Sequence, residues 1–160
     1  MRNRIVKWIS GILLASCGSV VAAEALPKTG TINLQAINKG TSSTKYNDEY
    51  THGTITGVTF NEQQKGLMHM GKSACSFSVF THEKVNKSVG FCSYEDKEGD
   101  KIFIQYEGTS AAEGEWSGVD EIIGGTGKFK NIRGDGAYSC AGTDKEGEFP
   151  CTVKLAYQLP

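Results

Sequence analysis

The stretch IIGGTGKFKNIRGDG, residues 122–136, decides how this chain folds. It follows the apolar pair Ile122 and Ile123 with five glycines among the next thirteen residues. Gly124, Gly125 and Gly127 supply backbone angles that other residues avoid, and they let neighbouring strands approach closely. The stretch therefore predicts a corner between two β-strands.

A phosphate-binding role for these glycines does not fit the spacing. A P-loop has a glycine separated by four residues from its Gly-Lys pair and a Ser or Thr after the lysine. Here Ile122 stands at the first position and Phe129 follows Lys128. A dinucleotide-binding fingerprint is excluded as well, because no helical pattern follows the glycines.

The hydrophobic pattern outside this corner has a period of two from Thr31 onward. Ile102, Ile104 and Tyr106 share one face of a predicted strand, and the last strand alternates in the same way. No stripe with the period of a helix occurs. Seven to nine short strands separated by turns predict an all-β sandwich or barrel. The polar residues 38–50 are interpreted as a loop.

Four cysteines remain once Cys17 is set aside with the N-terminal segment. An even number in an exported chain is typical of a disulfide framework. We predict the pairs Cys75–Cys92 and Cys140–Cys151, because each pair flanks a turn-rich connection between neighbouring strands. No Cys-x-x-Cys spacing or His–Cys pairing indicates a metal site.

A copper site at Met68-His69-Met70 is a weaker interpretation of a second motif. On a strand the two methionine side chains would share one face and His69 would take the other. Two core methionines beside a surface histidine is the preferred interpretation, so no metal and no cofactor are expected.

The N-terminal residues 1–23 have the layout of a secretory signal, with basic residues, an apolar run and small residues at the end. Residues 24–160 would then form a single exported domain, periplasmic or secreted. A second interpretation is a lipoprotein, because Leu14-Ala15-Ser16-Cys17 resembles a lipobox and would anchor the chain through Cys17.

The charge pattern argues against nucleic acid and anionic membranes as partners. Loss of residues 1–23 removes three basic and no acidic residues, which leaves a mildly acidic domain. No basic stripe remains to follow a phosphate backbone or a lipid surface.

The segment GGTGKFKNIRGDGAY resembles the motif of the allene oxide cyclase barrel-like and dirigent-like families, and bacterial secreted members are also similar around residues 98–108. The resemblance covers residues 31–159. It implies an antiparallel, eight-stranded, calycin-like β-barrel with a mostly apolar interior. Phe129 would plug one end, and Arg133 matches the arginine of the Arg-Gly step of dirigent-like members.

Three functions are compatible with these observations. The preferred hypothesis is a barrel that binds a small apolar ligand or an envelope partner, with Arg133, Tyr106 and Trp116 as ligand-binding candidates. The resemblance implies an alternative, an isomerase or cyclase of the allene oxide cyclase or dirigent type, for which no catalytic residue is assigned. The third is a purely structural envelope module with a filled interior.

Overall fold

The structure, a computed structural model, describes residues 26–112 and 114–160. These residues form eight strands and one short 3-10 helix, η1. The predicted signal segment 1–23 and Cys17 lie outside the described residues. The elements in chain order are β1 (Thr29–Lys45), β2 (Tyr50–Asn61), β3 (Gly71–His82), β4 (Val85–Glu95), β5 (Lys101–Ala112), β6 (Glu115–Gly125), η1 (Gly127–Phe129), β7 (Arg133–Ala141) and β8 (Glu148–Gln158).

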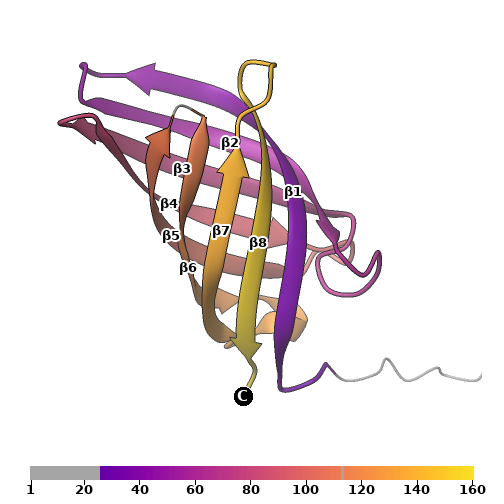
Figure 1. Cartoon of the computed structure of the whole chain (residues 1–160). Coiled ribbons are helices and arrows are strands. Elements are labelled where there is room, and N and C mark those ends of the chain that lie inside the picture. The colour runs from indigo at the N-terminus through magenta and orange to yellow at the C-terminus, as the bar shows by residue number, and fades with distance from the viewer. Residues whose placement is uncertain (1–25, 113) are drawn as a thin grey trace, which may run out of the picture.

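The eight strands form a closed antiparallel barrel in which each strand pairs with its neighbour in sequence and β8 pairs with β1 (Figure 1). This confirms the predicted all-β, eight-stranded barrel. Closure leaves no unpaired sheet edge. Because side chains alternate between the two faces of a strand, every second residue points into the barrel.

The apolar core fills one end of the barrel. Ile32, Leu34, Ile104 and Leu155 are fully buried there and pack with Phe129, which η1 carries across that end. The C-terminus and the first residues of β1 lie at this same end (Figure 1). We call it the closed end, and the opposite end, where β1 meets β2, the open end.

The glycine-rich corner lies at the closed end, as the sequence predicts. β6 stops at Gly125, η1 follows, and β7 begins at Arg133. Gly127 has a φ of 52°, in the left-handed region that glycine tolerates best. A Cβ added there would collide with the Asp100 carboxylate. The corner therefore depends on glycine for both its backbone angle and its close contact.

Both predicted disulfides are confirmed. Cys75 pairs with Cys92 across β3 and β4, and Cys140 pairs with Cys151 across β7 and β8. Each joins two directly opposite residues of neighbouring strands. Disulfides of this kind are typical of an oxidising compartment outside the cytoplasm.

Two local predictions are wrong. β1 continues to Lys45, so most of the polar segment 38–50 is strand and not loop. The hydroxyls of Thr41 and Ser42 bond to Thr54 of β2 in this region, at 2.8 and 2.7 Å. Polar side chains are compatible with a strand here because many of them face solvent beyond the core.

The Met68-His69-Met70 motif lies in a turn and not on a strand. Both methionines have positive φ, 58° and 55°. Met68 is buried in the core, where its carbonyl oxygen accepts a bond from the Thr59 hydroxyl at 2.7 Å. Met70 is 68% exposed. The prediction of two core methionines is therefore correct for Met68 and wrong for Met70, because the turn points one side chain into the core and the other toward solvent.

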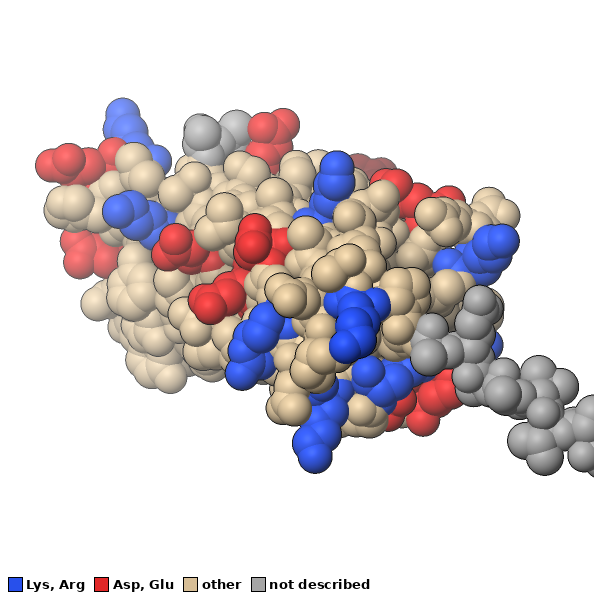
Figure 2. Space-filling model, turned by 90° about the horizontal axis from the view of Figure 1, so that it is seen from below, with Lys and Arg blue, Asp and Glu red and all other residues tan. Residues whose placement is uncertain are grey.

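Charged residues do not form a continuous field at the closed end. Figure 2, which views the molecule from below, shows Lys and Arg side chains mixed with Asp and Glu and separated by uncharged surface. Near this end Lys128 contacts both Asp96 and Glu98. Positive charge there is thus partly neutralised by local acidic partners.

Candidate functional site

The open half of the barrel contains an interior cavity of about 660 Å³. Its walls come from β1 to β8 and from the loop between β7 and β8. Gly40, Ser42 and Gly147 border it at the open end. At the inner limit, which we call the floor, it meets Tyr94 and Val153 of the core. The packed core below closes the other end, so the cavity is a blind chamber.

Glycines opposite aromatic rings keep this chamber open. Gly90 of β4 pairs with Tyr106 of β5, and a Cβ on Gly90 would overlap the Tyr106 ring. A Cβ on Gly108 would likewise overlap the Tyr138 hydroxyl. The rings therefore lie along the wall, in space that a side chain would otherwise occupy. Aromatic side chains commonly cover a strand glycine in this way.

The carboxyl group of Asp120 stands on β6 at the floor of the cavity. It is 4% exposed and lines the cavity between the inward positions of Gly118 and Ile122. Its Oδ2 atom is buried and has no hydrogen-bond partner among the described residues. Burial disfavours the charged form and raises the pKa of Asp120 to about 7. Both protonation states are thus populated near neutral pH.

Three tyrosines surround Asp120 from neighbouring strands: Tyr94 on β4, Tyr106 on β5 and Tyr138 on β7. Burial raises the pKa of each hydroxyl, and the negative charge of Asp120 raises it further. The hydroxyls therefore stay neutral at physiological pH. They can donate or accept hydrogen bonds beside the carboxyl group.

The rings of Tyr106 and Tyr138 are held in place by several contacts. They meet edge to face, with ring centroids 5.7 Å apart. The Tyr106 hydroxyl donates to the Ser76 carbonyl oxygen at 3.3 Å, and Ser88 Oγ lies 3.5 Å from the Tyr138 hydroxyl. These contacts hold the two rings against the cavity wall.

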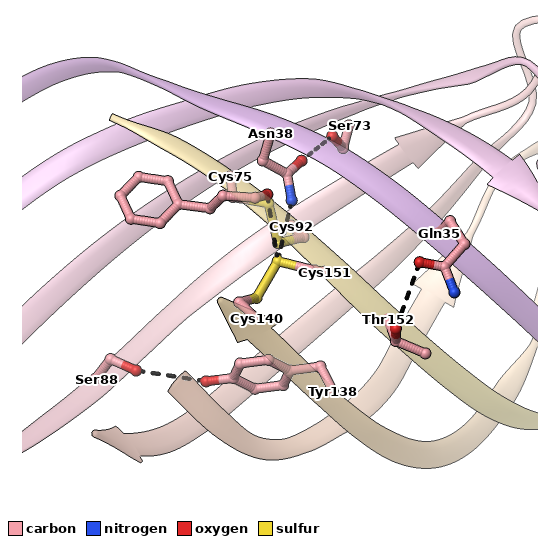
Figure 3. The surroundings of a disulfide bond; sticks show 11 residues. Gln35, Asn38, Ser73, Cys75, Ser88, Cys92, Tyr138, Cys140, Cys151 and Thr152 are labelled. Atoms are coloured by element: carbon pink, nitrogen blue, oxygen red, sulfur yellow. Dashed lines mark hydrogen bonds between the residues drawn. A yellow bond between two sulfur atoms is a disulfide. The ribbon is translucent and has the colours of Figure 1, made fainter. Parts of the chain in front are cut away.

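Both disulfides face the cavity, since all four cysteines belong to its wall. Figure 3 shows the Cys140–Cys151 bridge with the Asn38 side chain beside it. Asn38 Nδ2 donates to Cys151 Sγ at 3.4 Å, and Asn38 Oδ1 accepts from Ser73 Oγ at 2.8 Å. The wall is therefore cross-linked at two places and reinforced by a polar side chain between β1, β3 and β8.

The three ligand-binding candidates from the sequence separate in the structure. Tyr106 and Trp116 both line the cavity. Arg133 lies at the closed end, where Nη1 donates to the carbonyl oxygens of Ile123 and Ile132 at 2.9 Å each. It is exposed and does not reach the cavity, so it is not part of the site described below.

Sequence reasoning missed Asp120, the most distinctive group of the site. A signal existed, because the alternation Trp116, Gly118, Asp120, Ile122 puts a carboxylate on the inward face of a strand. Residues 26–112 and 114–160 contain no group of three His, Cys, Asp or Glu side chains that could hold a metal ion. Those same residues include no helix with the length and hydropathy needed to cross a membrane.

Comparison with known proteins adds a structural likeness. No protein-family model and no curated protein sequence matches the chain. Among solved structures, a pterocarpan synthase dirigent protein is similar, with a TM-score of 0.48 and 13% sequence identity. The match covers 91% of this chain and 100% of that one. The barrel topology described above rests on the strand pairing of this chain itself.

Proposed function

We propose that this protein binds a small, largely apolar molecule in the interior cavity. The observation that carries the proposal is the blind chamber of about 660 Å³, which lies within the range of small-molecule sites. Its wall combines aromatic rings and disulfide sulfurs with polar groups at the floor and around the open end. Ligand pockets usually combine apolar walls with a few polar groups in this way. A purely structural module would instead fill this space with side chains.

The test uses the neutral fluorescent probe N-phenyl-1-naphthylamine and a substitution that fills the open end. Gly40 faces the cavity, and a Cβ there would have only Gly147 O nearby, at 3.8 Å. Gly40→Phe should therefore be accommodated and occupy the chamber. We expect its affinity for the probe, measured by fluorescence titration, to fall at least tenfold.

Lys39→Phe is the matched control, because Lys39 is the neighbouring residue on β1 and points outward. It adds the same ring to the outer surface and should leave probe affinity unchanged. Equal affinity of the wild type and Gly40→Phe would place the probe outside the cavity and contradict the proposal.

A second candidate function is an isomerase or cyclase of the allene oxide cyclase or dirigent type, and Asp120 is the observation that favours it. A carboxyl group with a pKa of about 7 can donate and accept a proton near neutral pH. The Tyr94 hydroxyl, which stays neutral and lines the same cavity, can donate a hydrogen bond to a carbonyl oxygen. An acid–base residue in one cavity with such a donor suits proton transfer at carbon beside a carbonyl group.

This second function predicts turnover of a small test substrate, 3-cyclohexen-1-one. Asp120 would remove a proton from the carbon between the carbonyl and the double bond and return it two carbons further along, giving the conjugated ketone. We expect Asp120→Asn to lower the rate of appearance of the conjugated absorbance about 100-fold or more. A wild-type rate equal to that of buffer would contradict this function for that substrate class.

We also propose that the mature protein acts outside the cytoplasm, which the two disulfides support. Intact-mass measurement on protein from its native host should give a chain that begins at Glu24 or, with cleavage after Ala25, at Leu26, and that has both disulfides formed. A chain beginning at Cys17 and carrying acyl groups would also lie outside the cytoplasm, as an anchored lipoprotein, whereas a chain that keeps Met1 and has four free thiols would contradict the proposal.

A further inference from the structure

The cavity has an uneven charge distribution. Among the residues that line it, only Asp120 and Glu146 belong to the charged types, and both are acidic. No Lys, Arg or His belongs to that part of the described chain. An anionic molecule would meet two like charges and no partner of opposite sign.

Asp120 lacks the partner that a buried carboxylate needs. Its Oδ2 is buried and has no hydrogen-bond partner in the described part of the chain, and a charge buried without a partner is costly. A cation at the floor of the cavity would supply both the charge and the donated hydrogen bond. A neutral molecule could satisfy the acceptor but would not balance the charge.

The surrounding rings add to the attraction for a cation. Tyr94, Tyr106, Trp116 and Tyr138 contribute aromatic surface to the same chamber. Aromatic rings attract ammonium groups, most strongly where water is excluded. The neutral tyrosine hydroxyls can accept hydrogen bonds from an ammonium group without adding charge of their own.

From these observations we propose that the cavity selects hydrophobic molecules carrying one protonated amine, with the ammonium group at Asp120 and the apolar part toward the open end. This inference rests on the proposed binding function and names its ligand class. It follows from three features of the chamber: acidic residues without basic ones, an unpartnered buried carboxylate, and aromatic walls.

The inference also sets a pH dependence. The titratable groups facing Asp120 are Tyr94 from β4, Tyr106 from β5 and Tyr138 from β7, and all three stay neutral near pH 7. Of these four groups in the cavity, Asp120 is therefore the one that changes charge between pH 6 and pH 8. Its ionised fraction rises about tenfold over this interval, so amine affinity should rise by about the same factor.

The test compares three probes of similar size: 2-phenylethylamine, 2-phenylethanol and phenylacetate. Each displaces N-phenyl-1-naphthylamine in competition titrations on the intact protein. At pH 8 we expect the amine to bind at least tenfold more tightly than the alcohol, and phenylacetate to bind most weakly. From pH 6 to pH 8 amine affinity should rise about tenfold while alcohol affinity stays constant.

Asp120→Asn should bring the ratio of amine to alcohol affinity close to one. Glu121→Gln is the matched control, because Glu121 is the adjacent residue on β6 and lies exposed on the outer face. It should keep the wild-type ratio.

A wild-type ratio near one, or a ratio that survives Asp120→Asn, would overturn the amine inference while leaving the binding proposal intact. Failure of N-phenyl-1-naphthylamine itself to bind would overturn the proposed function and the inference with it. The two failures are therefore distinguishable.

Discussion

Asp120→Asn will make the free energy of unfolding less sensitive to pH. Between pH 5 and pH 8 the wild type should lose roughly 3 kcal/mol more of this free energy than the variant. The pKa of this carboxyl group is about 7 in the folded protein, against 3.8 in the reference state. Between these values the folded protein binds one proton more than the unfolded chain.

The sign of the effect follows from this difference in proton binding. Because the folded state holds the extra proton, raising the pH removes stability. The loss begins above about pH 4 and is complete once Asp120 ionises in the folded protein, near pH 7. Asparagine does not titrate, so the variant lacks this loss. Its free energy of unfolding should therefore fall less than that of the wild type between pH 5 and pH 8.

Urea unfolding of both proteins at pH 5, 6, 7 and 8, with the disulfides intact, measures the effect. Glu121→Gln, on the outer face of the same strand, should run parallel to the wild type. Parallel curves for Asp120→Asn as well would show that Asp120 is ionised in the folded protein throughout this range.

Phe129→Ala should cost about 3–5 kcal/mol, the usual loss when a fully buried phenylalanine is truncated. Phe129 has no exposed surface and packs in the core at the closed end. Its backbone N–H donates to Thr126 O at 2.9 Å, and its carbonyl oxygen accepts from Ile132 N at 3.0 Å. These bonds hold the η1 backbone in place, so it cannot move inward to fill the space that the missing ring leaves.

Guanidinium unfolding followed by far-UV circular dichroism measures this loss. Phe91→Ala is the control, because Phe91 lies on the outer face of β4 and is 54% exposed. It should cost less than about 1 kcal/mol. A similar small cost for Phe129→Ala would mean that the closed end is held by other residues and that Phe129 does not plug it.

Much of the fold could be predicted because local patterns determine it. Inward residues such as Ile102 and Ile104 alternate visibly with outward ones, and neighbouring strands pair throughout, so cysteines flanking a hairpin were bound to meet. The extension of β1 through residues 38–45 was missed, because polar residues near an open barrel end carry no hydrophobic alternation.

The site was harder to predict because the position of an inward side chain along the barrel depends on how all eight strands pair. Alternation places Asp120 on the inward face, but only the pairing of the strands shows that Tyr106 lies directly opposite it and that Tyr94 and Tyr138 line the same cavity. The same limit explains Arg133. Its motif position was visible in the sequence, whereas the distance between the closed end and the cavity emerges only once the chain is folded.

The blind chamber also fixes the orientation of a bound ligand. Because Phe129 and its neighbours pack the closed end, a ligand enters and leaves past Gly40 and Gly147 at the open end. One end of the bound ligand then lies at Asp120 and the other lies near the opening. The end near the opening can stay attached to a group that is too large to enter the cavity. Coupling such a ligand to a resin through the end near the opening should therefore preserve binding of the protein, whereas coupling through the end at Asp120 should abolish it.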